Sequence, residues 1–235
     1  MTSYNADFRR NVRYELMLGR EASEAIAKFP VGYLPVGCLE RHGDHLPMGL
    51  DVIKAHGICC LVAQVLGGVV FPPHYYSGIH LMPPERIRKY TGEWGNVYTD
   101  ATAEASLVDT GRQFAIAGIK VLVLYSGHYP TCQCEMVQRV ADQLNGEGSM
   151  RVIPFWEPQI LPGDHAGINE TALMLYIDRS LVDMSRIGEV NFRDHGWSEE
   201  NSPRRATVTK GEADVAAIIE HLRAKIQAEL GRPAR

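Results

Sequence analysis

The sequence has no uninterrupted apolar stretch of about 18 residues, the length that a membrane-spanning helix requires. It also has no excess of basic residues. The 24 lysines and arginines against 28 aspartates and glutamates give a net charge of −4, which argues against a protein that binds the phosphate backbone of nucleic acids. The polar first 13 residues contain no apolar core of a secretory signal. We therefore expect a cytoplasmic protein that binds neither membranes nor nucleic acids.

Cysteine is scarce. The five cysteines stand at positions 38, 59, 60, 132 and 134. An odd number without a secretory signal predicts reduced thiols rather than a disulfide framework. Cys132 and Cys134 are separated by one residue and have no second cysteine pair nearby, so we interpret them as buried or half-buried thiols rather than as a metal site.

Several sequence motifs with known chemistry are missing. The chain contains neither of the glycine-rich nucleotide-binding patterns, G-x-G-x-x-G and G-x-x-x-x-G-K-[ST]. It also lacks the G-x-S-x-G turn of serine hydrolases. No internal repeat, linker or low-complexity segment interrupts the 235 residues. We therefore predict one domain over residues 1–235, large enough to bury a sizeable core.

Strand and helix patterns alternate along the chain. Short apolar runs predict strands at residues 32–37, 69–71, 119–125 and 150–155. Helical patterns occur at residues 12–28, 52–66, 97–117, 131–145, 171–176 and 211–230. The run at 119–125 is apolar almost throughout, which is typical of a strand buried on both faces of a parallel sheet. The predicted fold is a three-layer α/β/α sandwich with a mostly parallel central sheet.

The segment 40–51 concentrates side chains that can bind a metal ion. Four of them are candidates as they stand, namely Glu40, His42, His45 and Asp51, with Asp44 as a fifth. Glu40 and His42 are two residues apart, so in an extended chain they point to the same side. Glycines and a proline between 43 and 49 let the backbone fold back toward them. Because buried charges are costly unless they are paired, this cluster indicates either a bound cation or a solvated polar loop.

Two later segments also run from an apolar stretch into a histidine. His128 follows the strand predicted at 119–125, at the end of a parallel sheet where ligands bind in open α/β folds. His165 and Glu170 lie in the segment 162–171, and Glu170 stands near the start of a predicted helix, where a carboxylate is favoured.

Together these segments resemble the creatininase (creatinine amidohydrolase) family. Members of the family carry an E-x-H-G-x-H-L-P-x-x-x-D block, which matches residues 40–51. They carry a later G-H block, which matches 127–128, and an H-A-G-x-x-E-T block, which matches 165–171. A weaker fourth match lies at residues 206–211. The resemblance covers most of the chain, from about residue 34 to 211.

The resemblance implies roles for individual residues. The family's metal ligands correspond to Glu40, His42, Asp51 and His128, with Asp51 as the bridge between two ions. His165 corresponds to a general acid that protonates the leaving nitrogen, with a packing or supporting role as the alternative. His45 and Asp44 are not ligands in the family.

Two departures from the family pattern affect these assignments. Creatininase has a glutamate two residues after the histidine of the G-H block, and this chain has Pro130 there. We predict that Glu170 replaces it as a ligand and acts in catalysis, with a helix-capping carboxylate as the alternative. The family's F-P-G-T run is replaced by residues 81–84, so the metal blocks alone do not determine the substrate class. His74 and His80 are candidates for lining the pocket.

Carboxylate and imidazole ligands suit zinc, manganese or iron, and zinc is favoured. Their number exceeds what one catalytic ion needs, which predicts two divalent ions. The expected reaction is hydrolysis of an amide C–N bond in a small cyclic or linear substrate by a metal-activated water. Alternatives are a formamide deformylase, a short-peptide hydrolase or a non-catalytic metal-binding or assembly protein. The resemblance also implies a homo-oligomer, commonly a hexamer.

Overall fold

The computed structural model describes residues 12–80, 83, 85, 100–188 and 197–232. Its sheet consists of four parallel strands in the order β2-β1-β3-β4. The strands are β1 (Val31–Val36), β2 (Val69–Val70), β3 (Val121–Ser126) and β4 (Arg151–Phe155). Its α-helices include α2 (Gly19–Lys28), α3 (Leu50–Leu66), α5 (Asp100–Ile116), α6 (Thr131–Glu147), α7 (Ile168–Ile177) and α9 (Val208–Leu230).

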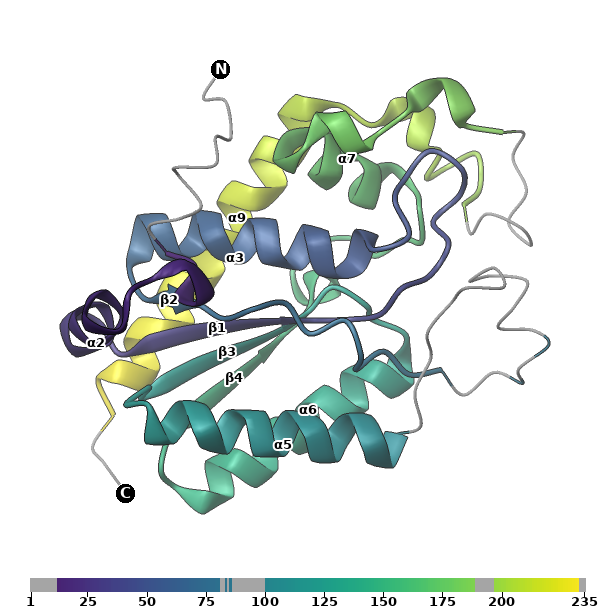
Figure 1. Cartoon of the computed structure of the whole chain (residues 1–235). Coiled ribbons are helices and arrows are strands. Elements are labelled where there is room, and N and C mark those ends of the chain that lie inside the picture. Colours follow the sequence, from purple (N-terminus) through teal and green to yellow (C-terminus); the bar gives the residue numbers. More distant parts are fainter. Residues whose placement is uncertain (1–11, 81–82, 84, 86–99, 189–196, 233–235) are drawn as a thin grey trace.

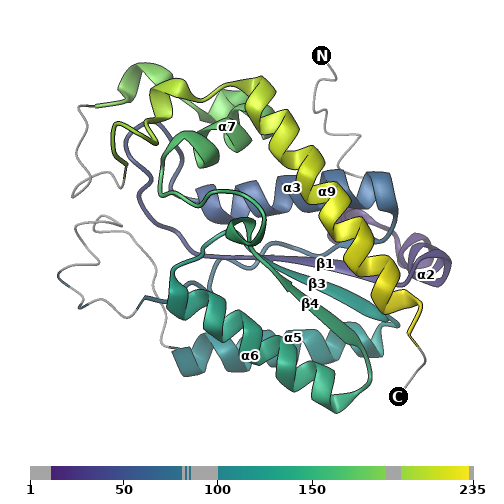
Figure 2. The same cartoon turned by 180° about the vertical axis from the view of Figure 1, so that it is seen from behind.

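Helices cover both faces of the sheet (Figures 1 and 2). Successive residues of β3 alternate between two apolar clusters. Val121, Val123 and Tyr125 pack with α3, α7 and α9 on one face. Leu122 and Leu124 pack with α5 and α6 on the other. Because side chains of a strand point alternately to opposite faces, a strand that is apolar throughout needs two covering layers. The predicted three-layer α/β/α sandwich with a parallel sheet is confirmed.

Several helix starts differ from the sequence prediction, and two of them have a clear local cause. The pattern at 12–28 is not one helix. A 3₁₀ turn spans Tyr14–Leu16, and α2 begins at Gly19. The Glu21 carboxylate accepts a hydrogen bond from the Leu18 backbone N–H at 2.8 Å, which fixes that start. Helix α7 begins at Ile168 rather than at 171, because the carboxylate of Asp164 accepts hydrogen bonds from its first-turn N–H groups.

The strand order determines where a site can form. From β1 the chain passes through α3 to β2 on one side, and β3 then pairs with β1 on the other. The order of strands therefore reverses between β1 and β3, and open α/β sheets bind ligands in the crevice beyond the carboxyl ends of the strands at such a point. The segments that follow β1 and β3 carry four of the five predicted metal ligands, namely Glu40, His42, Asp51 and His128.

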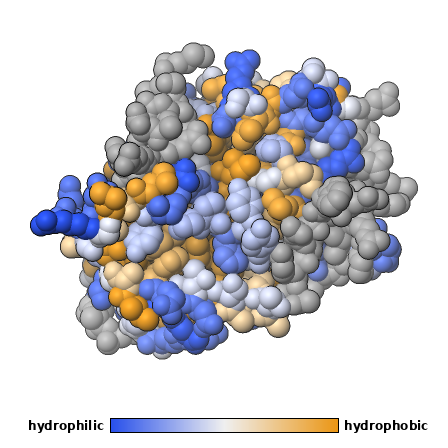
Figure 3. Space-filling model, in the orientation of Figure 1, coloured by the Kyte–Doolittle hydropathy of each residue, from blue (hydrophilic) through white to orange (hydrophobic). Residues whose placement is uncertain are grey.

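Surface character agrees with a globular protein. On the face shown in Figure 3, hydrophilic and apolar residues are interspersed, as is usual for proteins in water. Among the described residues, no helix combines the length and the apolar character that crossing a lipid bilayer would require.

Gly127 lets the first turn of α3 approach the end of β3. A Cβ atom on Gly127 would lie 2.0 Å from the carbonyl oxygen of Asp51, which is backbone and cannot move aside alone. We therefore predict that Gly127→Ala lowers the free energy of unfolding by about 1–3 kcal/mol or more, as overpacking does. Urea denaturation measures the change.

Gly146 in α6 is the matched control, since a Cβ added there meets no heavy atom within 4 Å. Gly146→Ala should raise stability by roughly 0.5–1 kcal/mol, the usual gain from replacing glycine inside a helix. If the two variants shifted the urea midpoint equally, the close approach at Gly127 would have no energetic role.

Candidate metal centre

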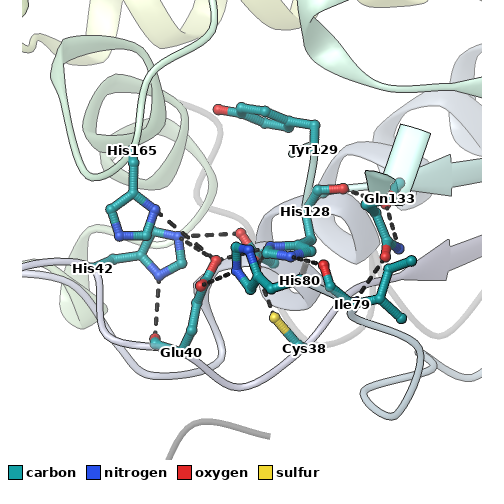
Figure 4. A network of polar contacts seen from close by, with 12 residues as sticks. Cys38, Glu40, His42, Ile79, His80, His128, Tyr129, Gln133 and His165 are labelled. Atoms are coloured by element: carbon teal, nitrogen blue, oxygen red, sulfur yellow. Dashed lines mark hydrogen bonds and ion pairs between the residues drawn. The ribbon is translucent and has the colours of Figure 1, made fainter. Parts of the chain in front are cut away.

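The structure brings the five predicted ligand residues together at the carboxyl end of the sheet. Figure 4 shows three of them, Glu40, His42 and His128. The five residues come from four segments: the loop after β1 (Glu40, His42), the first turn of α3 (Asp51), the loop after β3 (His128) and the first turn of α7 (Glu170). All five residues are buried, with at most 3% of the surface of each exposed. The cluster is therefore not the solvated polar loop that the sequence left open.

Asp51 lies between two groups of donor atoms. Its Oδ1 is 3.2 Å from Nε2 of His42, which belongs to a group with Asp51 and Glu170. Its Oδ2 is 3.2 Å from Nδ1 of His128, which belongs to a group with Glu40, Asp51 and Cys38. Within each group the donor atoms lie within 4.8 Å of one another. Around a tetrahedral zinc ion, nitrogen and oxygen ligands are about 3.3 Å apart, so both groups fit an ion of this size.

The histidines present a ring nitrogen to the site because the other nitrogen is held by the backbone. In each of three rings that nitrogen lies at hydrogen-bonding distance from a carbonyl oxygen, namely His42 from Glu40 (3.2 Å), His128 from Ile79 (3.2 Å) and His165 from Arg41 (2.9 Å). A carbonyl only accepts, so these nitrogens carry the proton. In the neutral ring, which a metal ion requires, the opposite nitrogen offers its lone pair, as in histidine metal ligands whose orientation is set by an outer hydrogen bond.

The charges of the cluster stabilise one another. Burial by itself lowers the pKa of His42, but the carboxylates of Asp51, Glu170 and Glu40 outweigh it and raise the pKa to about 9. Burial raises the pKa of Asp51, but the neighbouring His42 and His128 lower it to about 2. Nε2 of His42 is buried and, among the described residues, has no aligned hydrogen-bond partner. Ionised carboxylates around such a nitrogen are a donor set for a cation.

Glu170 is held so that one of its oxygens faces the cluster. Its Oε1 accepts hydrogen bonds from Lys54 Nζ at 2.8 Å and from the Tyr129 hydroxyl at 3.0 Å. Its Oε2 accepts one from the Ala166 backbone N–H at 2.7 Å and lies 3.6 Å from Nε2 of His42. Ala166 has φ of 56°, an uncommon value for a residue other than glycine, and its N–H meets this carboxylate.

Lys54 is the main residue of the site that the sequence analysis missed. It is fully buried one turn after Asp51, and its Nζ lies 3.3 Å from Glu157 and 3.2 Å from the carbonyl oxygen of Gly127. The signal was present, since a lysine inside the almost wholly apolar stretch 52–66 needs a buried acidic partner. Its partners, Glu157 and Glu170, are far away in sequence and could not be inferred from it.

A cavity of about 370 Å³ lies over both groups of donors, and His165 lines it. The His165 side chain is 29% exposed, its Nδ1 is 4.0 Å from Oε1 of Glu40, and its ring centre is 4.3 Å from that of His42. Burial and the neighbouring His42 lower the pKa of His165. A neutral imidazole at the cavity wall can accept a proton and return it.

Of the four remaining candidates, His80 lines the cavity, and His74, His45 and Asp44 do not. His80 lines the cavity with its Nε2 3.3 Å from Glu40 Oε2. His74 instead lies against Ser106. His45 bonds to the Thr171 hydroxyl at 3.0 Å. Asp44 pairs with Arg41 and has a side chain 56% exposed.

Pro130 also lines the cavity, and its ring carries no donor atom, as expected. Of the substituted run 81–84, the residues 81, 82 and 84 lie outside the described part of the chain.

Comparison with known proteins connects this site to one family. The creatininase model, described as creatinine amidohydrolase, matches residues 15–226. Creatinine amidohydrolase of Pseudomonas putida is 29% identical over 175 residues, which are 66% of this chain and 66% of that protein. The mycofactocin precursor peptide peptidase of Mycolicibacterium smegmatis is 29% identical over 184 residues, 74% of this chain and 68% of that protein. The match thus spans about two thirds of each curated relative.

Solved structures share the fold. A crystal structure of creatinine amidohydrolase superposes with a TM-score of 0.75 at 24% identity and covers 95% of this chain and 99% of its own. A manganese form of creatininase gives a TM-score of 0.74 at 23% identity and covers 94% of this chain and 100% of its own. A zinc–zinc form of a creatininase point variant gives a TM-score of 0.70 at 23% identity, and the match covers 92% of this chain and 97% of that chain.

The buried Lys54–Glu157 pair predicts how the stability of the protein depends on pH. Burial raises the pKa of the Glu157 carboxyl to about 7, despite Lys54, from 4.5 in an exposed group. Between these pH values the folded protein holds a proton that the unfolded chain has released. The contribution of Glu157 to the free energy of unfolding therefore falls as pH rises from 4.5 to 7, by about 1.4 kcal/mol for each unit by which its pKa is raised.

Glu157→Gln cannot titrate, so we expect it to lose less stability than the wild type over this pH window. Urea denaturation at pH 4.5, 6 and 7.5 measures the difference. Glu135→Gln, at an exposed position of α6, serves as the control and should follow the wild type. Parallel pH profiles for the wild type and Glu157→Gln would contradict the prediction.

Proposed function

The chain belongs to the creatininase family of amidohydrolases, and from this premise we propose that it hydrolyses an amide-type C–N bond of a small cyclic or linear substrate at a site for two divalent ions. Glu40, Asp51 and His128 would hold one ion, and His42, Asp51 and Glu170 the other. The observation that carries the proposal is the Asp51 carboxylate, whose Oδ1 lies near His42 of one donor group and whose Oδ2 lies near His128 of another. The donor types favour zinc, with manganese or iron as alternatives.

When bound, such ions polarise the amide carbonyl and make a water molecule acidic enough to attack it. The chain's own residues would supply the proton transfers. His165 carries its fixed proton on Nε2, which faces the carbonyl of Arg41, and its Nδ1 faces Glu40 across the site. This Nδ1 can accept a proton from the attacking water and deliver it to the leaving nitrogen. Glu170, held by Lys54 and Tyr129, would keep one oxygen for the ion and thus replace the carboxylate absent at Pro130.

A short peptide is the second candidate substrate. The similarity to the mycofactocin precursor peptide peptidase equals the similarity to creatinine amidohydrolase in percentage identity, so identity does not choose between the two substrate classes. A panel of creatinine and other cyclic amides, formamides and short peptides, assayed with added zinc, manganese or iron, separates these possibilities. A protein that binds metal and turns over none of them would favour the non-catalytic alternative.

Two expectations from the resemblance remain proposals, namely a homo-oligomer, commonly a hexamer, and a cytoplasmic location. The apolar and aromatic residues of the segment 74–98 are our candidates for packing between subunits, and most of this segment lies outside the described residues. A sedimentation mass near that of one 26.1 kDa chain at micromolar concentration would count against the oligomer.

The bridging role of Asp51 predicts metal content. Asp51→Asn keeps the size of the side chain and removes its charge, so it should lose both ions, whereas Glu170→Gln should lose one. Metal analysis of the purified variants after dialysis measures both. Asp44→Asn, at an exposed acid of the same loop, is the control and should bind metal as the wild type does. Two equivalents retained by Asp51→Asn would rule out a bridge.

The proton-transfer role of His165 predicts a loss of rate without a loss of metal. His165→Gln should lower kcat by roughly 10²- to 10⁴-fold, the usual contribution of a general acid or base. Its metal content should remain that of the wild type. His221→Gln, in the last helix, is the matched control for the loss of an imidazole and should keep the wild-type rate. A His165→Gln variant within a few-fold of that rate would remove the residue from the mechanism.

A further inference from the structure

Cys38 lies beside the first donor group. It stands two residues before Glu40 and is completely buried, and its Sγ is 3.6 Å from Oδ2 of Asp51. Its sulfur, with one donor atom each from Glu40, Asp51 and His128, forms a set of four whose members all lie within 4.8 Å of one another. Figure 4 shows the sulfur directed toward the cluster. Sequence analysis treated this residue only as a reduced thiol.

The backbone at Gly78 packs directly against the Cys38 side chain and limits its position. A Cβ atom on Gly78 would lie 2.1 Å from Cβ of Cys38, so the chain at Gly78 passes directly against this side chain. The residues that line the cavity include Glu40, Asp51 and His128 but not Cys38. The sulfur therefore approaches the donor group from the protein interior rather than from the cavity wall.

The surroundings of this thiol are those of a ligand rather than of a core residue. Buried cysteines usually behave as small apolar groups, whereas Cys38 lies among two carboxylates and an imidazole. Around a tetrahedral zinc ion with bonds of about 2.3 Å to sulfur and 2.0 Å to oxygen, those two ligand atoms are about 3.5 Å apart. In the structure the Cys38 thiol donates a hydrogen bond to Oδ2 of Asp51 over 3.6 Å, so these two atoms already lie about as far apart as two ligands of one zinc ion.

We propose that Cys38 is the fourth protein ligand of the ion held by Glu40, Asp51 and His128. This inference rests on the proposed function, because it requires that the donor group binds a metal. On binding, the sulfur–hydrogen bond breaks, the proton leaves to solvent and the thiolate donates its electron pair to the ion.

A thiolate ligand has two consequences. Soft ligands favour zinc or iron over manganese, so Cys38 biases the choice of metal at this position. Four protein ligands also complete a tetrahedral set, which in proteins is typical of a closed site. The group of His42, Asp51 and Glu170 supplies only three donors, all nitrogen or oxygen, and is the one with a place for water.

Cobalt(II) substitution tests the ligand directly, because a thiolate bound to cobalt gives an intense near-ultraviolet charge-transfer band and oxygen or nitrogen ligands do not. The cobalt-loaded wild type should show this band. Cys38→Ser should lose it while keeping the visible bands of bound cobalt. Cys134→Ser, at a half-buried cysteine whose sulfur contacts the Tyr129 carbonyl, should keep both.

Cys38→Ser should also shift the preference from zinc toward manganese by at least about tenfold, since even an outer partner of a ligand changes metal affinity by that factor.

If Cys38→Ser fails to fold, a variant that keeps Cys38 and replaces the other four cysteines tests the same ligand. With the cysteines at 59, 60, 132 and 134 replaced and Cys38 kept, the band should persist, and its loss would overturn the proposal. Wild-type protein that binds cobalt without the band would overturn the role of Cys38 and leave the proposed function intact. Wild-type protein that binds no cobalt, zinc or manganese would overturn both.

Discussion

Buried negative charge is the constraint on which the rest of the structure depends. The carboxylates of Glu40, Asp51 and Glu170 are buried next to one another at the carboxyl end of the sheet. Burial of an unpaired carboxylate is costly, so each must meet a positive charge or a set of hydrogen-bond donors. Lys54 meets Glu170, and the imidazoles of His42 and His128 lie against Asp51. The arrangement that pairs these charges also gathers carboxylate oxygens and imidazole nitrogens that could bind a metal ion.

The fold places that charge where chemistry can use it. Parallel strands β1 and β3 end side by side, so the loops that follow them deliver Glu40, His42 and His128 to one point. Gly127 allows the first turn of α3 to bring Asp51 against the loop after β3. Helix α7 packs on α3 and adds Glu170 from a segment about 120 residues later in the chain than Asp51. One side of the cluster opens to the cavity, and the interior side carries Cys38.

The strongest predictions from sequence came from long local patterns. The apolar run at 119–125 predicted β3 within two residues, and the helix after Asp51 was found nearly in full, because both elements are buried along their length. The motif resemblance predicted which five residues gather at this site, and their role as metal ligands is a proposal. Lys54, Glu157 and the orientation of Cys38 were not, since each depends on partners that only the folded chain brings near. The start of α7 was placed three residues late, because the capping carboxylate of Asp164 lies outside the helix itself.

The most direct test is a crystal structure of metal-loaded protein with anomalous diffraction recorded at the zinc and manganese absorption edges. A site for two ions bridged by Asp51 predicts two anomalous peaks, one on each side of the Asp51 carboxylate. The first should contact Glu40 and His128, and the second should contact His42 and Glu170. One peak alone, or two peaks that do not share Asp51, would contradict it.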